Sequence, residues 1–121
     1  MEKLILIVDD SSTNLLIARN MLHNDYQVIT VSSAKKMFSI LEKIKPDLIL
    51  LDIEMPGMDG FEALELLKTS RPGIPVIFLT VMNDSEMETR GLQLGAVDFL
   101  IKPLSKSTLL ERIKPHLTGQ T

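Results

Sequence analysis

The chain has 121 residues, of which 45% are apolar and 24% charged, which suits one globular domain and excludes wholesale disorder. Thirteen Lys and Arg side chains stand against sixteen Asp and Glu, a formal net charge of −3, and this argues against a nucleic-acid binder, which would need a basic face. Cysteine is absent and only two histidines are present, which excludes disulfides and thiolate metal sites and disfavours a histidine zinc site.

The first apolar run, residues 4–8, is ended at once by Asp9 and Asp10. It is too short for the core of a signal peptide. Elsewhere no apolar stretch approaches the ~20 residues that are needed to span a bilayer. We therefore expect a cytoplasmic domain that does not engage a membrane.

Five short apolar runs have the length and the Val, Ile and Leu content of β-strands. They are residues 4–8, 27–31, 48–51, 75–80 and 98–101. Four of them are nearly continuous in apolar character, as expected for parallel strands that are covered on both faces. The run at 27–31 is the most polar of the five and is predicted to be an edge strand.

The segments that follow these runs carry apolar residues at helical spacing. In chain order the stripes are Leu15, Ala18 and Leu22; Ala34, Met37, Phe38, Leu41 and Ile44; Phe61, Leu64 and Leu67; Met87, Gly91 and Leu94; Leu109, Ile113 and Leu117. Ser33, Asp59 and Ser105 stand where N-caps are needed, and Gly95 stands where a helix ends. Pro46 is expected to close the second helix.

Strictly alternating strands and helices predict a parallel sheet with right-handed crossovers. Five units give a doubly wound α/β domain, a five-stranded parallel sheet flanked by five helices, whereas a closed barrel would need about eight units. We expect this domain to span residues 1–117 and the polar residues 118–121 to be a tail or the start of a linker.

Polar residues end four of the predicted strands. Asp9 and Asp10 follow the first strand, Asp52 the third, Thr80 ends the fourth, and Lys102 follows the fifth. Ligand sites of open parallel sheets lie at the carboxyl ends of the strands. We therefore expect these five side chains to meet in one crevice.

The charges of this set predict a bound cation. Asp9, Asp10 and Asp52 contribute −3 and Lys102 contributes +1, which leaves −2, and like charges this close raise a pKa unless a cation intervenes. Mg²⁺ would neutralise the set, and it prefers oxygen ligands. A carboxylate can attack phosphorus to form an aspartyl phosphate. Mg²⁺, Lys102 and the Thr80 hydroxyl could position the phosphoryl oxygens and neutralise their charge, one group per oxygen.

Four motifs together resemble the response-regulator receiver family of two-component signalling, the CheY-like proteins with a flavodoxin-like fold. They are Ile-Val-Asp-Asp at 7–10, Leu-Leu-Asp-Ile-Glu-Met-Pro-Gly-Met-Asp-Gly at 50–60, Phe-Leu-Thr at 78–80 and Phe-Leu-Ile-Lys-Pro at 99–103. The resemblance covers nearly the whole chain. Each motif alone is weak, but all four in this order are specific.

The resemblance implies a role for each matching residue. Asp52 would accept the phosphoryl group, and Mg²⁺ would be held by Asp9, Asp10 and Asp52 together with the backbone carbonyl of Glu54.

Lys102 would contact the phosphoryl oxygens, and its peptide bond to Pro103 would be cis. Thr80 would turn toward the phosphoryl group, and Phe99 would change rotamer with it.

The same resemblance implies a switch that promotes only its own phosphoryl transfer and dephosphorylation. The donor would be a sensor histidine kinase or a histidine phosphotransfer protein. The phosphorylated form would act on a C-terminal output domain or a docking partner, or form a homodimer through the fourth helix, fifth strand and fifth helix, with no direct nucleic-acid contact. Residues 111–117 resemble those of receivers that precede cyclic-di-GMP enzymes.

Two alternatives stay open. The second hypothesis is a receiver-like binding module that carries no phosphate. It is suggested by Val81, which stands where the family has a small residue and would narrow access to Asp52. Met82 and Glu54 occupy positions that influence dephosphorylation in the family, in a direction that the sequence does not give. The third hypothesis is an enzyme, but an aspartate phosphatase would have Asp-x-Asp after the first strand and a flavin carrier would have aromatic ring sandwiches.

Overall fold

The alternation of short apolar runs and amphipathic segments produces one parallel sheet with helices on both faces. The computed structural model describes residues 2–81 and 84–117; Met82 and the predicted tail 118–121 lie outside the described residues. The strands are β1 (Leu4–Val8), β2 (Gln27–Val31), β3 (Leu48–Asp52), β4 (Val76–Thr80) and β5 (Asp98–Ile101). The helices are α1 (Ser12–Leu22), α2 (Ala34–Leu41), α3 (Gly60–Ser70), α4 (Ser85–Gln93) and α5 (Lys106–Ile113), followed by a 3₁₀ turn, η1 (Lys114–His116).

All neighbouring strands pair in parallel, in the order β2-β1-β3-β4-β5. The predicted doubly wound α/β fold is therefore confirmed, and β2 is an edge strand as expected. The chain reverses its direction of winding between β1 and β3, where Val8 lies beside Leu51. This register places Asp9 and Asp52 next to each other at the carboxyl edge of the sheet.

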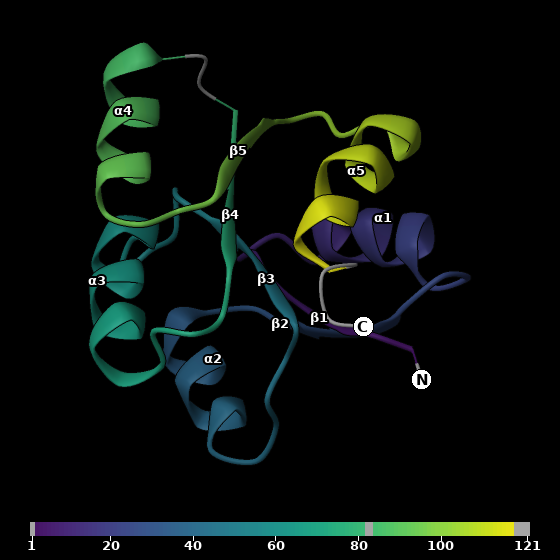
Figure 1. The fold of residues 1–121 in the computed structure, drawn as a ribbon, viewed down its shortest axis with the longest axis horizontal. Helices are drawn as coiled ribbons and strands as arrows, with labels where there is room; N and C mark the ends of the chain where they lie inside the picture. The colour runs from purple at the N-terminus through teal and green to yellow at the C-terminus, as the bar shows by residue number, and fades with distance from the viewer. Residues whose placement is uncertain (1, 82–83, 118–121) are drawn as a thin grey trace.

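The sheet separates two apolar cores, because successive side chains of a strand point to opposite faces. Leu6 and Val8 of β1 face the core beneath α2, α3 and α4. Ile5 and Ile7 face the core beneath α1 and α5. Figure 1 shows this division, with α1 and α5 on one side of the strands and the other three helices on the opposite side.

Side-chain caps fix where the helices begin. The Ser33, Asp59 and Ser105 side chains each accept a backbone N–H from the first turn, as the sequence predicts, and Asp59 forms a full capping box with Glu62. Gly95 has a φ of 110° directly after α4, a left-handed conformation that glycine adopts without steric cost.

Two helices end earlier than their apolar stripes suggest. The helix α2 ends at Leu41 rather than near Ile44, because the next N–H groups bond three residues back and tighten the chain into a turn before Pro46. The helix α5 ends at Ile113, because Pro115 has no N–H to donate and the chain continues as a 3₁₀ turn. Among the described residues, no helix is long and apolar enough to cross a bilayer.

Candidate functional site

Three carboxylates gather at the carboxyl edge of the sheet, where the winding reverses. Asp9, Asp10 and Asp52 each offer an oxygen, and these atoms lie within 4.8 Å of one another. Asp9 and Asp52 are 1% and 2% exposed, whereas Asp10 faces solvent. Strand β1 sets the first two positions and β3 sets the third, so the sheet brings together residues that are far apart in sequence.

Lys102, which follows β5, forms ion pairs with two of these carboxylates. Its Nζ donates to Asp9 Oδ2 at 2.8 Å and lies 3.2 Å from Asp52 Oδ1. The other Asp9 oxygen accepts the backbone N–H of Ser11 at 2.9 Å, at the start of α1. The peptide bond from Lys102 to Pro103 is cis.

The electrostatics of the site are dominated by Asp52. Burial raises its pKa from 3.8 to about 7, and the Asp9 carboxylate adds to the rise while Lys102 opposes it. Burial alone would lower the pKa of Lys102, but its hydrogen bond to Asp9 and the charge of Asp52 raise that pKa above its ordinary value. The pocket therefore holds more negative charge than its single ammonium group neutralises.

One oxygen of this pocket lacks a hydrogen bond. Asp52 Oδ1 is buried and accepts no hydrogen bond from the described residues, although Lys102 forms an ion pair with it. A buried acceptor without a hydrogen bond is stabilised by a bound cation or by a further hydrogen-bond donor. Three converging carboxylate oxygens are the donor set that Mg²⁺ takes, so the residues present fit this cation.

Thr80 ends β4, as the sequence predicts, and its side chain makes a contact that the sequence does not predict. The Thr80 side chain is fully buried, and its hydroxyl donates to the Glu54 carboxylate, at 3.0 Å to Oε2 and 3.2 Å to Oε1. The resemblance implied a role for the Glu54 backbone carbonyl and an influence of this position on dephosphorylation, but no contact between its side chain and Thr80. No pattern in the sequence gives the direction of this side chain, because it lies in the loop after β3.

Phe99 lies away from the carboxylates, in the core beneath α4. It is 7% exposed and packs edge-on against Phe78, with ring centroids 5.5 Å apart. Phe78 in turn packs edge-on against Phe61 of α3 at 5.3 Å. The guanidinium of Arg90 from α4 covers the Phe61 ring at 4.2 Å. A series of aromatic contacts therefore connects α3, β4, β5 and α4.

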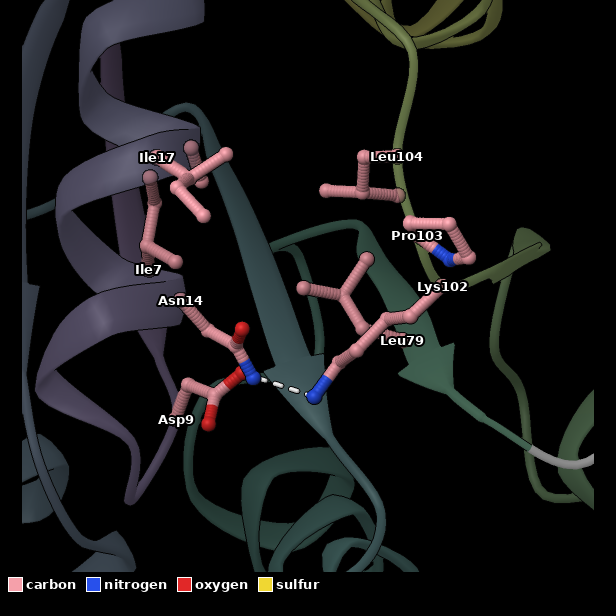
Figure 2. Close-up of a pocket in the computed structure, with 9 residues that line it drawn as sticks. Ile7, Asp9, Asn14, Ile17, Leu79, Lys102, Pro103 and Leu104 are labelled. Atoms are coloured by element: carbon pink, nitrogen blue, oxygen red, sulfur yellow. Dashed lines mark hydrogen bonds and ion pairs between the residues drawn. The ribbon is translucent and has the colours of Figure 1, made fainter.

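A small cavity of about 80 Å³ opens beside Lys102, between α1 and the loop after β5. Figure 2 shows Ile17 on one wall, Pro103 and Leu104 on the other, and Lys102 reaching across to Asp9. Its walls are largely apolar, and Asp9 and Lys102 connect it to the acidic pocket. Val81, which the sequence analysis expected to narrow access, is 63% exposed at the surface.

Comparisons with known proteins agree with this geometry. Residues 5–114 match the model of the response regulator receiver domain. The chain belongs to this family. It is a signalling module of two-component systems rather than an enzyme in the ordinary sense, and its acidic pocket is typical of the Mg²⁺ site of receivers.

Two curated relatives illustrate the match. A probable cyclic di-GMP phosphodiesterase of Vibrio cholerae is 42% identical over 118 residues, which are 96% of this chain and 27% of the relative. Protein PilH of Pseudomonas aeruginosa is 36% identical over 118 residues, which are 95% of this chain and 98% of the relative. For the first curated relatives the chain spans between 25% and 49% of their length.

Solved structures share the whole fold. A CheY-like receiver domain protein from Methanospirillum hungatei has a TM-score of 0.91 at 34% identity, over 99% of this chain and 97% of its own. A BeF3-activated DrrB receiver domain has a TM-score of 0.89 at 29% identity, over 97% of this chain and 98% of its own. The five-stranded order and the surrounding helices are therefore those of the CheY-like fold.

Proposed function

We propose that this receiver is a switch that accepts a phosphoryl group on Asp52. The observation that supports this most strongly is the convergence of Asp9, Asp10 and Asp52 within 4.8 Å, with Lys102 in contact with two of them. Phosphoryl transfer depends mainly on positioning and on neutralising charge. A pocket with one buried nucleophile, further carboxylates for a cation and one fixed ammonium group meets both needs.

In the proposed reaction an Asp52 carboxylate oxygen attacks the phosphorus of a phosphohistidine. The new O–P bond forms as the N–P bond breaks, and the imidazole nitrogen keeps the electron pair. Lys102 already lies 3.2 Å from Asp52 Oδ1, so it is in position to hold a phosphoryl oxygen. When bound by Asp9, Asp10, Asp52 and the Glu54 carbonyl, Mg²⁺ would supply the remaining positive charge.

The consequence of the transfer would be a change of charge in a buried place. Asp52 would change from about −1 to about −2, which attracts nearby donors. Thr80 ends the neighbouring strand β4, where Asp52 pairs with Leu79, so its hydroxyl is in position to turn toward a phosphoryl oxygen. Phe99 would change rotamer in response, and the face formed by α4, β5 and α5 would then bind a partner or a second copy.

Receiver domains work with histidine kinases, and this chain would take its phosphoryl group from a sensor histidine kinase or a histidine phosphotransfer protein, in the cytoplasm. We propose that residues 1–117 form the receiver domain. An output domain or a docking partner would bind the phosphorylated and unphosphorylated forms with different affinities. The relative whose name is probable cyclic di-GMP phosphodiesterase supports an output of that class.

Mass spectrometry tests the proposal directly. The protein is incubated with acetyl phosphate and Mg²⁺, and the adduct is mapped by peptide analysis after hydroxamate trapping. We expect one phosphoryl group on Asp52, and none in an Asp52→Asn variant. A wild-type protein without the adduct, and with equally negligible Mg²⁺ affinity in wild type and Asp10→Ala, would favour the phosphate-free binding module.

A further inference from the structure

The contact between Thr80 and Glu54 constrains the residue on which the proposed switch depends. The Thr80 side chain is fully buried at the end of β4. Its hydroxyl lies within hydrogen-bonding distance of both oxygens of the Glu54 carboxylate, 3.0 Å from Oε2 and 3.2 Å from Oε1. Glu54 belongs to the loop after β3 and is itself exposed. The contact therefore links two neighbouring strand ends through a side chain that is free to leave toward solvent.

A threonine hydroxyl has only one hydrogen to donate. While this hydrogen is directed at Glu54, it is not available to a phosphoryl oxygen on Asp52. A hydrogen bond to an ionised acceptor is also stronger than one between neutral groups. The Glu54 carboxylate thus competes with a phosphoryl oxygen on Asp52 for the hydrogen of the Thr80 hydroxyl.

The charge of Glu54 acts in the same direction. Its carboxylate approaches a pocket in which Asp9, Asp10 and Asp52 already outnumber Lys102. An incoming phosphoryl donor is itself an anion, so a fourth carboxylate nearby disfavours its approach. Hydrogen bond and charge are separable by experiment, because glutamine keeps an acceptor oxygen and loses the charge.

We propose that the Glu54 side chain is a latch that holds Thr80 in the unphosphorylated arrangement and slows phosphorylation of Asp52. This inference rests on the proposed function and deepens it, since it assigns a regulatory role to a side chain at the same site. Glu54 acts through Thr80 and is therefore a positioning residue. When the Glu54 contact breaks, the hydrogen of the Thr80 hydroxyl can be donated to the phosphoryl group instead.

A double-mutant cycle tests the latch. The rate of adduct formation with acetyl phosphate and Mg²⁺ is measured for wild type, Glu54→Ala, Thr80→Val and the double variant. We expect Glu54→Ala to raise the rate by about three- to tenfold in the presence of Thr80, the range that the net contribution of one typical hydrogen bond gives. In the Thr80→Val background only the charge repulsion by Glu54 remains, so the same change is expected to raise the rate by less, under about twofold. Glu54→Gln, which loses the charge and keeps an acceptor, is expected to be intermediate in the Thr80 background.

A second readout does not depend on phosphorylation. In methyl NMR spectra of the unphosphorylated protein, the Thr80 methyl resonance should move in Glu54→Ala but stay in place in Glu65→Ala, which removes an exposed glutamate from α3. The Glu65→Ala rate should equal that of wild type.

The outcomes separate the two proposals. If Asp52 is phosphorylated equally fast in wild type and Glu54→Ala, or if the gain is the same in both Thr80 backgrounds, the latch is wrong and the phosphoacceptor function stands. If no variant and no wild-type protein forms the adduct, the proposed function is wrong and the latch falls with it.

Discussion

Replacing Asp52 by asparagine should make this protein more stable, even though it removes an ion pair. Burial and the Asp9 carboxylate raise the Asp52 pKa from 3.8 to about 7. One pKa unit corresponds to about 1.4 kcal/mol, so ionising Asp52 costs the folded protein up to roughly 4 kcal/mol relative to the unfolded chain. An amide at this position carries no charge and avoids that cost.

The sign of the pH dependence follows from the direction of the shift. Folded protein holds the Asp52 proton more tightly than the unfolded chain does, so wild-type stability falls as the pH rises from about 4 to about 7 and then levels off. The stability gain of Asp52→Asn should therefore be about 2–4 kcal/mol near pH 8 and should vanish near pH 4.

Urea unfolding followed by circular dichroism, in buffers with a chelator at a series of pH values, measures this gain. Asp25→Asn is the control, because Asp25 is exposed and its removal should change the free energy of unfolding by less than about 0.5 kcal/mol. The reasoning is refuted if Asp52→Asn is no more stable than wild type near pH 8, or if its gain is the same at every pH.

Two further stability predictions concern the elements around the site. In Gly91→Ala the new Cβ would lie 2.5 Å from Phe99 Cε2 and 2.9 Å from Phe78 Cδ2, so these rings or α4 must shift, and we expect a loss of about 1–3 kcal/mol in urea unfolding. Gly73→Ala meets no atom within 4 Å and should be neutral; equal effects of the two substitutions would contradict the close packing. Burial works to raise the Asp98 pKa, but the hydrogen bonds from Arg112 outweigh it and hold that pKa below its ordinary value. The ion pair of Asp98 and Arg112 therefore stabilises the fold at pH values above the pKa that Asp98 has in the unfolded chain. This stabilisation is lost as the pH falls through the lowered Asp98 pKa of the folded protein. Since Arg112 is 44% exposed, we expect the free energy of unfolding of wild type to exceed that of Asp98→Asn by at most about 1 kcal/mol near neutral pH. In strong acid the two proteins should be equally stable, and a difference that persists in acid would contradict this explanation.

The strands could be predicted from the sequence because their signals are local and redundant. The run at 48–51 is apolar at every position, which is typical of a strand buried on both faces, and β3 extends it only to Asp52. Once the strands are placed, parallel pairing brings their carboxyl ends together, so the convergence of Asp9, Asp10, Asp52 and Lys102 follows from topology.

Features that depend on side-chain direction or on exact helix ends could not be predicted in this way. The apolar stripe through Ile44 continues past the end of α2, because Ile44 is half-buried without being helical. The Thr80–Glu54 hydrogen bond depends on how a loop residue orients over a neighbouring strand. The inward packing of Phe99 depends on a glycine at position 91, which leaves room for its ring beneath α4.

The central claim is that one pocket gathers Asp9, Asp10, Asp52, Thr80 and Lys102 for a cation and a phosphoryl group. A crystal structure of the protein with Mg²⁺ and beryllofluoride tests it most directly. The account predicts beryllium bonded to an Asp52 oxygen, the cation among the three aspartates, Lys102 on one fluoride, and the Thr80 hydroxyl turned from Glu54 toward another. Beryllofluoride absent from Asp52, or a cation held elsewhere, would contradict it.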